Sequence, residues 1–246
     1  MPARNQQMCQ KGSRASQVLK LMVVFVLLLL VLGITANAQE TMVQFHMAIM
    51  KRGPNWTANP NKDALATQQK HLEFAQSLLD SGKAVIAGPI KDASDLVGIY
   101  IFRAASADEA KSLVMADPLV AGGQMVPEMH PWWAEDVFLK PATPLTLKMV
   151  YVAFLRKGAK WTAESTPATE ALQKAHMDNI HRLADSKKLV IAGPFGDDGD
   201  LRGIFVLRVD SIDEARSLTA SDPAVKAGRF VLDVHPWLVP DGVLPQ

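Results

Sequence analysis

The chain has 246 residues, of which 48% are hydrophobic, and its formal charge is nearly balanced, with 26 Lys and Arg against 25 Asp and Glu. This length suits one large domain or two smaller ones. The densest basic clusters are only the pairs Lys51-Arg52 and Arg156-Lys157. A protein that binds a polyanion needs denser basic clusters, so nucleic acid is not expected as a partner.

Residues 1–38 are typical of a secretory signal peptide. Four basic residues precede an unbroken apolar run over 21–32, and Ala36 and Ala38 are the small residues expected before a cleavage site at Gln39. The apolar run is shorter than the roughly 20 residues that span a bilayer comfortably. We expect a periplasmic or secreted protein with no membrane contact after cleavage. An uncleaved membrane anchor is the alternative.

Cleavage would change both charge and cysteine content. The mature chain would keep 22 Lys and Arg against 25 Asp and Glu, a net charge of −3. The single cysteine, Cys9, lies in the segment expected to be removed. The mature chain would therefore have no disulfides, even in a compartment that permits them.

The rest of the sequence contains one pattern twice. Residues 42–136 recur at 147–241 with a constant shift of 105 and no gap, so that His71 corresponds to His176. We predict two domains with these bounds, joined by a short proline-containing linker over 137–146.

Taken in chain order, each copy predicts the elements β-α-β-β-α-β. The expected first strand places Phe45, Met47 and Ile49 on one face. In the first copy the expected elements are a strand over 44–50, a helix with Leu65, Leu72 and Leu79 on its apolar stripe, strands over 83–87 and 98–103, a helix capped by Ser106, and a strand over 125–130. Gly82 is expected to end the first helix, and its counterpart is Lys187, so that glycine cap is not shared.

This order predicts an α+β fold with helices on one face of an antiparallel sheet. The second face of such a sheet needs a partner, and the other copy is the obvious one. We therefore expect the two bare sheet faces to pack together within one chain as a pseudo-twofold barrel or sandwich, with the functional site near that junction.

Several short motifs occur in the same order in both copies, and together they resemble the YCII-related domain family. The motifs are Gln68-x-x-His71-Leu72, Gly82 to Pro89, Glu109-Ala110, Asp117-Pro118 and Pro131-Trp132, matched in the second copy by His176, Ala192-Gly193-Pro194, Glu214-Ala215, Asp222-Pro223 and Pro236-Trp237. The resemblance covers nearly the whole mature chain.

The resemblance implies a ferredoxin-like unit that ordinarily pairs into a dimeric α+β barrel, here fused into one polypeptide. It also implies a His and Asp dyad in a cleft, and at least one relative is a dehydrochlorinase that acts on a chlorinated hydroxyquinol. This chain departs from the usual pattern in its expected export, in its duplication, and in lacking an arginine shortly before the helix histidine.

The two helix histidines, His71 and His176, are the candidate catalytic bases. An imidazole near its ordinary pKa of about 6.5 can take or give a proton at neutral pH. Asp117 and Asp222 are the candidate groups that orient them. The alternatives are a core histidine bonded to backbone and an Asp-Pro pair that only caps a short helical turn.

A second candidate set lies on the last strand of each copy. Glu128 with His130, and Asp233 with His235, alternate with apolar residues. If the apolar residues face the helices, these polar pairs point toward the other copy, beside His46 or its counterpart Tyr151. We assign His130 and His235 to substrate binding, against the simpler interpretation of a half-solvated pair at a strand end.

Trp56 and Trp161 follow a glycine loop, and we assign them to substrate binding because tryptophan offers a large contact area. Trp132 and Trp237, which close each unit, can also line a ligand pocket. Core packing is the alternative for all four and the commoner role of tryptophan. The acidic segments around Asp92 and Asp197 are interpreted as turns without an ion. No metal site is expected, because the histidines lack close paired spacing.

The sequence therefore predicts a tandem YCII-related protein with two cleft sites. Its proposed activity is that of a lyase or isomerase that uses His and Asp on a small organic substrate and needs no cofactor. The alternative is a noncatalytic ligand-binding or scaffold module of the same fold. A small-molecule ligand and a monomer with an internal pseudo-dimer are the expected partner and assembly.

Overall fold

The computed structural model describes residues 42–245, so the expected signal peptide lies outside the described residues. Within them the elements are β1 (Met42–Arg52), α2 (Lys62–Asp80), β2 (Ala84–Pro89), β3 (Leu96–Phe102), α3 (Ala107–Met115), α4 (Pro118–Ala121), β4 (Met125–Glu135), β5 (Leu147–Lys157), α5 (Pro167–Asp185), β6 (Leu189–Pro194), β7 (Leu201–Leu207), α6 (Ile212–Ala220), α7 (Pro223–Lys226) and β8 (Phe230–Pro240). No helix among them has an apolar stretch long enough to cross a bilayer.

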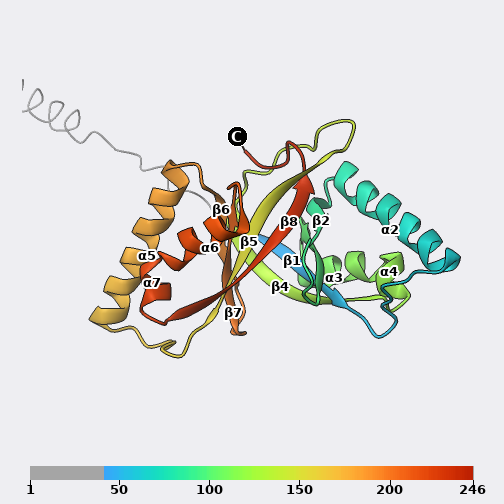
Figure 1. Cartoon of the computed structure of the whole chain (residues 1–246). Helices are drawn as coiled ribbons and strands as arrows, with labels where there is room; N and C mark the ends of the chain where they lie inside the picture. Colours follow the sequence, from blue (N-terminus) through green and yellow to red (C-terminus); the bar gives the residue numbers. More distant parts are fainter. Residues whose placement is uncertain (1–41, 246) are drawn as a thin grey trace, which may run out of the picture. The chain divides into compact units, whose positions relative to one another are not determined.

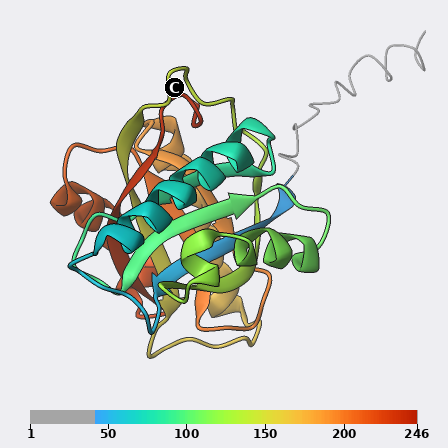
Figure 2. The same ribbon diagram turned by 90° about the vertical axis from the view of Figure 1, so that its right-hand side faces the viewer.

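Each repeat is a ferredoxin-like unit, as predicted. The strands form two sheets, ordered β2-β3-β1-β4 and β6-β7-β5-β8, with antiparallel neighbours throughout. The last strands, β4 and β8, continue about five residues beyond the predicted ends. Helices α2, α3 and α4 cover the outer face of the first sheet and α5, α6 and α7 that of the second (Figures 1 and 2).

The inner faces of the two sheets form one apolar core, which confirms the prediction of a pseudo-dimeric α+β barrel. Phe45, Met47 and Ile49 of β1 belong to this core together with Val152 and Phe154 of β5. The alternate residues of each strand pack under the helices in two separate cores. Period-two alternation thus gives the strands one face toward the other repeat and one toward their own helices. It is interrupted at register shifts in β2 and β6, where the adjacent residues Val85 and Ile86 of β2 both join the inter-repeat core.

The two sheets meet edge to edge through reciprocal contacts. The indole Nε1 of Trp237 donates to the carbonyl oxygen of Gly88 over 3.1 Å, and Trp132 donates to Gly193 over the same distance. Both indoles are fully buried, which confirms core packing for them. A Cβ on Gly88 would lie 1.9 Å from the carbonyl oxygen of Leu238, so only glycine permits this approach.

The first helix differs from prediction in its apolar stripe, whereas the serine caps of the later helices agree with it. Leu65 and Leu72 are more than half exposed, and the buried residues of α2 are Leu78 and Leu79, since its N-terminal part extends beyond the sheet-covering face. The serine caps Ser106 and Ser211 are confirmed by bonds from Glu109 N and Glu214 N.

The residue after the helix adopts the same left-handed backbone in both repeats, with φ of 70° at Gly82 and 58° at Lys187. The cap is therefore shared in geometry although its residue is not. A lysine held in this conformation is disfavoured relative to glycine.

Candidate functional site

Both predicted His and Asp pairs are formed. In the first repeat, Nδ1 of His71 lies 3.0 and 2.8 Å from the two carboxylate oxygens of Asp117. In the second, Nδ1 of His176 lies 2.9 Å from Oδ2 of Asp222. The histidine comes from the long helix and the aspartate from the start of the short one, so the packing of α2 on α4 and of α5 on α7 creates each pair.

Each aspartate is fully buried and has a second function. Asp117 and Asp222 are the N-caps of α4 and α7, where they accept the amide hydrogens of Leu119 and Ala224. Proline follows each of them at the first helical position, as predicted for a capping pair. Capping fixes the carboxylate, and the fixed carboxylate orients the imidazole, so the two roles coexist.

A third donor holds each carboxylate, and it differs between repeats. The hydroxyl of Tyr100 donates to Asp117 over 2.8 Å, whereas the amide of Asn179 donates to Asp222 over 2.9 Å. The counterpart of Tyr100 is Phe205 and that of Asn179 is Phe74, so neither donor has a polar twin. Repeat comparison missed both residues for that reason.

The electrostatics favour an ionised acid beside the imidazole of the second repeat. Burial alone would raise the pKa of Asp222, but the hydrogen bond and charge of His176, with the bonds from Ala224 and Asn179, lower it below its ordinary value. Burial, then the charge and hydrogen bond of Asp117, raise the pKa of Tyr100, which stays a neutral donor. Because a carboxylate only accepts, Nδ1 of each histidine carries the proton and Nε2 is the nitrogen that can exchange one.

The imidazoles are not sealed completely. The side chain of His71 is 16% exposed and that of His176 is 9% exposed. His176 stacks on Phe205 at 5.8 Å between ring centres, and His71 meets Tyr100 edge-on at 6.4 Å. Both lie between helices and sheet, on the face away from the other repeat. The expectation that these pairs lie near the inter-repeat junction is therefore wrong, because their helices cover the face of each sheet that points away from the junction.

The second candidate set does lie at that junction. Nδ1 of His130 is 2.7 Å from Asp197, and Nδ1 of His235 is 2.6 Å from Asp92, each aspartate belonging to the other repeat. The acidic turns interpreted as ion-free loops thus supply the partners of these histidines.

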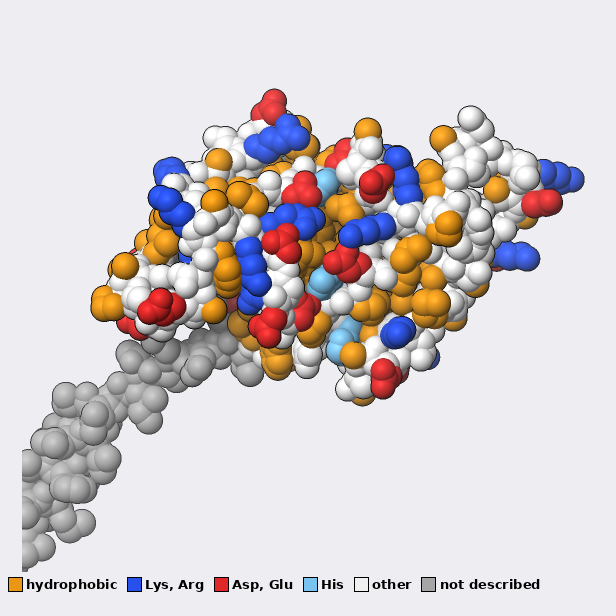
Figure 3. Space-filling model, turned by 90° about the horizontal axis from the view of Figure 1, so that it is seen from below, with side chains coloured by type: hydrophobic (Ala, Val, Ile, Leu, Met, Phe, Trp, Pro, Cys, Tyr) orange, Lys and Arg blue, Asp and Glu red, His pale blue; other side chains and the backbone are white. Residues whose placement is uncertain are grey.

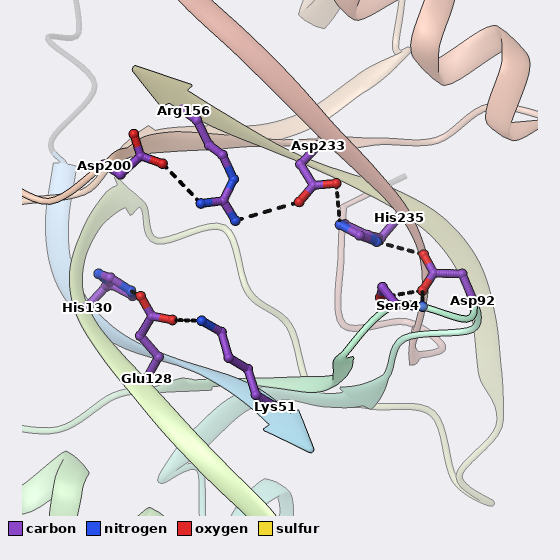
Figure 4. Close-up of polar contacts among 9 residues, drawn as sticks. All are labelled: Lys51, Asp92, Ser94, Glu128, His130, Arg156, Asp200, Asp233 and His235. Carbon is purple, nitrogen blue, oxygen red and sulfur yellow. Dashed lines mark hydrogen bonds and ion pairs between the residues drawn. The ribbon is translucent and has the colours of Figure 1, made fainter. Parts of the chain in front are cut away.

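On its other side each junction histidine lies close to an acid of its own strand (Figure 4). Nε2 of His130 is 3.2 Å from Glu128, and Nε2 of His235 is 2.9 Å from Asp233, but neither contact is aligned as a hydrogen bond. Lys51 pairs with Glu128, and Arg156 bridges Asp233 and Asp200. Seen from below, histidine side chains reach the surface among interleaved acidic and basic side chains (Figure 3).

His46 and Tyr151 do not join this set, contrary to expectation. Met47 pairs with His130 across the sheet and faces the other repeat, so His46, one residue earlier, faces the helices. Burial lowers the pKa of His46, against the opposing charge of Glu109. Tyr151 packs against the helix-side core of its own repeat.

The two glycine-loop tryptophans have different surroundings. Trp56 is 40% exposed, with the guanidinium of Arg52 5.5 Å from its ring centre. Trp161 is half-buried and packs on Phe230 at 5.6 Å, and Phe230 in turn lies 5.5 Å from His176. Only Trp161 is therefore joined by ring contacts to a candidate base. Between residues 42 and 245 no group of His, Cys, Asp and Glu is arranged to hold a metal ion.

Comparison with known proteins identifies solved structures with the same fold, and one protein family whose model matches the chain twice. Solved structures of chlorite dismutase from Candidatus Nitrospira defluvii, a mutant and a complex with imidazole, align with TM-scores of 0.55 and 0.54 at 12% and 11% identity. Both alignments cover 82% of this chain and 92% of the other. At such identities the likeness shows the fold alone.

Sequence relatives identify the family. An uncharacterised protein of Bacillus subtilis (strain 168), YjpA, is 34% identical over 62 residues, which are 25% of this chain and 71% of that protein. The model of the YCII-related domain matches residues 44–132 and again 149–238, inside the two predicted domains. The chain is therefore a member of the YCII-related domain family, with two copies of the domain in tandem.

Proposed function

We propose that this protein is an acid–base catalyst with two sites, one in each repeat, in which Nε2 of His71 and His176 exchanges a proton with a small organic substrate. The observation that carries the proposal is the Nδ1 contact of each histidine with a fully buried aspartate. A buried carboxylate selects the tautomer with a free Nε2 and stabilises the imidazolium that forms when this atom takes a proton.

The reaction class is that of a lyase or isomerase. In an isomerisation Nε2 removes a proton from carbon, the electron pair shifts into an enolate, and the same proton returns at another atom. In an elimination the pair instead expels a leaving group such as chloride, and the products are the alkene, a proton and the chloride ion. Neither step changes the oxidation state of the protein, so an oriented imidazole that acts as the base is sufficient.

A noncatalytic ligand-binding module is the second candidate, because Asp117 and Asp222 also cap helices. Proton exchange separates the two. The purified protein would be incubated in D2O with a panel of cyclic ketones and hydroxyquinols, chlorinated members included, and followed by proton NMR. Catalysis predicts deuterium incorporation or product formation that the His71→Gln/His176→Gln double variant loses. Equal rates in both proteins would remove the histidines as bases.

We also propose that the protein acts outside the cytoplasm, on the basis of the basic and apolar character of residues 1–38. Mass spectrometry of the protein purified from its native compartment would identify the mature N-terminus. Gln39 as the first residue is expected, and a retained Met1 on soluble cytoplasmic protein would contradict export.

A further inference from the structure

Three cationic side chains surround Trp161 in the second repeat. The guanidinium carbons of Arg229 and Arg202 lie 4.4 and 5.1 Å from the centre of its rings, and Nζ of Lys157 lies 5.8 Å away. They come from the residue before β8, from β7 and from the end of β5. All four side chains are half-buried. Positive charge gathered in such a place is unfavourable unless an anion opposes it.

The chain supplies these cations mainly with neutral partners. Arg202 and Lys157 donate to the backbone carbonyls of Asp197 and Asp198. In the described part of the chain none of the three cations lies within ion-pair distance of a carboxylate. The Asp197 carboxylate contacts His130, and the charge of Arg202 contributes only the last of the causes that lower its pKa. Nε of both Arg202 and Arg229 is shielded from solvent and lacks an acceptor. Stacking on Trp161 offsets part of this cost.

The cluster adjoins the candidate base of the same repeat. The guanidinium of Arg229 lies 5.9 Å from the ring centre of Phe230, which packs against both Trp161 and His176. The ring of Phe230 therefore separates Arg229 from the imidazole, and Arg202 and Lys157 reach it through Trp161 as well. A ligand with an anionic group on a ring can span that separation.

The first repeat lacks the cluster. The counterparts of Arg202 and Arg229 are Val97 and Gln124. Its tryptophan, Trp56, is exposed and contacts a single cation, Arg52. The two His and Asp pairs thus have different electrostatic surroundings, although the Nδ1 contact with a buried aspartate is formed in both.

We propose that Arg202 and Arg229 form a binding site for the carboxylate of a small aromatic or cyclic acid, so that the second repeat takes an anionic ligand that the first does not. Guanidinium groups recognise carboxylates through paired N–H donors, and the half-buried Trp161 places an aromatic side chain beside them. That this ligand is a substrate of His176 rests on the proposed function, whereas its binding does not.

The test measures benzoate and its neutral isostere benzamide by isothermal titration calorimetry. Wild type is expected to bind benzoate about tenfold more tightly than benzamide. Arg202→Val/Arg229→Gln, which installs the residues of the first repeat, should abolish that preference. Arg216→Gln, which removes one exposed charge from α6, should keep it. Should the double variant fail to fold, Arg229→Gln alone is the milder variant. It is expected to lose about half of the logarithm of the benzoate-to-benzamide affinity ratio.

Two results would overturn the site: benzoate binding wild type no better than benzamide, or the preference surviving in the folded arginine variants. His176→Gln distinguishes this inference from the proposed function. It should keep the benzoate preference, because the imidazole is not part of the anion site. A protein that binds benzoate selectively but exchanges no protons would retain the binding site and refute the catalytic role.

Discussion

His235 of the second repeat contacts Asp92 of the first, with 2.6 Å between Nδ1 and Oδ2. The pseudo-twofold counterpart, His130 with Asp197, repeats the contact at 2.7 Å. Each repeat therefore supplies one histidine and one aspartate to the junction. These pairs lie on the opposite sheet face from the candidate bases, so they stabilise the assembly of the repeats and can be altered without touching His71 or His176.

Acid should weaken this junction. Burial raises the pKa of Asp92 and Asp197, but hydrogen bonds, including those from His235 and His130, outweigh it and leave both pKa values lowered. A lowered pKa contributes stability that is present above the unfolded value, about 3.9 for Asp, and is lost as pH falls through the folded value. Thermal unfolding midpoints should therefore drop below about pH 4.

The matched variant is Asp92→Asn/Asp197→Asn. It should lose about 1 to 2 kcal/mol per site at pH 7 and show a shallower fall in midpoint below pH 4. Asp63→Asn, on the exposed start of α2, serves as the control for removal of a carboxylate. If the unfolding midpoint of the double variant fell below pH 4 as steeply as that of wild type, these aspartates would not be the source of the pH dependence.

Replacing Lys187 by glycine should stabilise the protein by about 1 kcal/mol, because its φ of 58° is strained for a residue with a Cβ. The twin position provides the opposite change. Gly82→Ala should destabilise by a similar amount, and since a Cβ there meets no atom within 4 Å, the loss would be conformational. Denaturation by urea measures both, and a Lys187→Gly protein less stable than wild type would contradict the assigned strain.

Gly193→Ala should destabilise by about 3 kcal/mol, because its Cβ would lie 1.9 Å from the carbonyl oxygen of Trp133 and force the strand edges apart. Gly199→Ala, in an exposed turn, is the comparison; its nearest contact is a side-chain oxygen of Asp197. Equal unfolding free energies for the two variants would show that the inter-repeat edge tolerates separation.

Asp222→Asn separates capping from orientation. Asparagine caps helices as well as aspartate does, so the loss from α7 should be small. Its amide can donate to Nδ1 of His176, which favours the wrong tautomer. Any activity of the second site should therefore fall by about 10²- to 10⁴-fold, mostly in kcat. Asp117→Asn is the same change in the first repeat. Unchanged kcat in both variants would assign the aspartates to capping alone.

Residue pattern predicted the strand faces and the serine caps, because both depend on local periodicity and capping chemistry. The His and Asp pairs followed from the resemblance to the YCII-related domain family, and the repeat supported them because both residues recur in the second copy of this chain. The exposure of Leu65 and Leu72 was not predictable, since helical spacing does not reveal where the sheet beneath a helix ends. Nor did chain order indicate that Asp92 faces His235, because that contact joins residues 143 apart.

Comparing the two copies could not identify every residue of the candidate sites. It selects residues that have a twin, and Tyr100, Asn179, Arg202 and Arg229 have none. These are the residues that distinguish the two candidate sites. A search for charged residues that replace neutral ones between the copies would have found both arginines, though not their position around Trp161.

The proposed proton exchange at Nε2 of His71 and His176 depends on their tautomer, which can be measured without a substrate. Long-range proton–nitrogen correlation NMR of protein labelled with 15N at histidine distinguishes a pyrrole-like from a pyridine-like ring nitrogen. At a pH where the imidazoles are neutral, we expect a protonated Nδ1 and an unprotonated Nε2 at both residues, reversed in Asp117→Asn/Asp222→Asn. A protonated Nε2 in wild type would contradict the proposed exchange, because the nitrogen assigned as the base could then accept no proton.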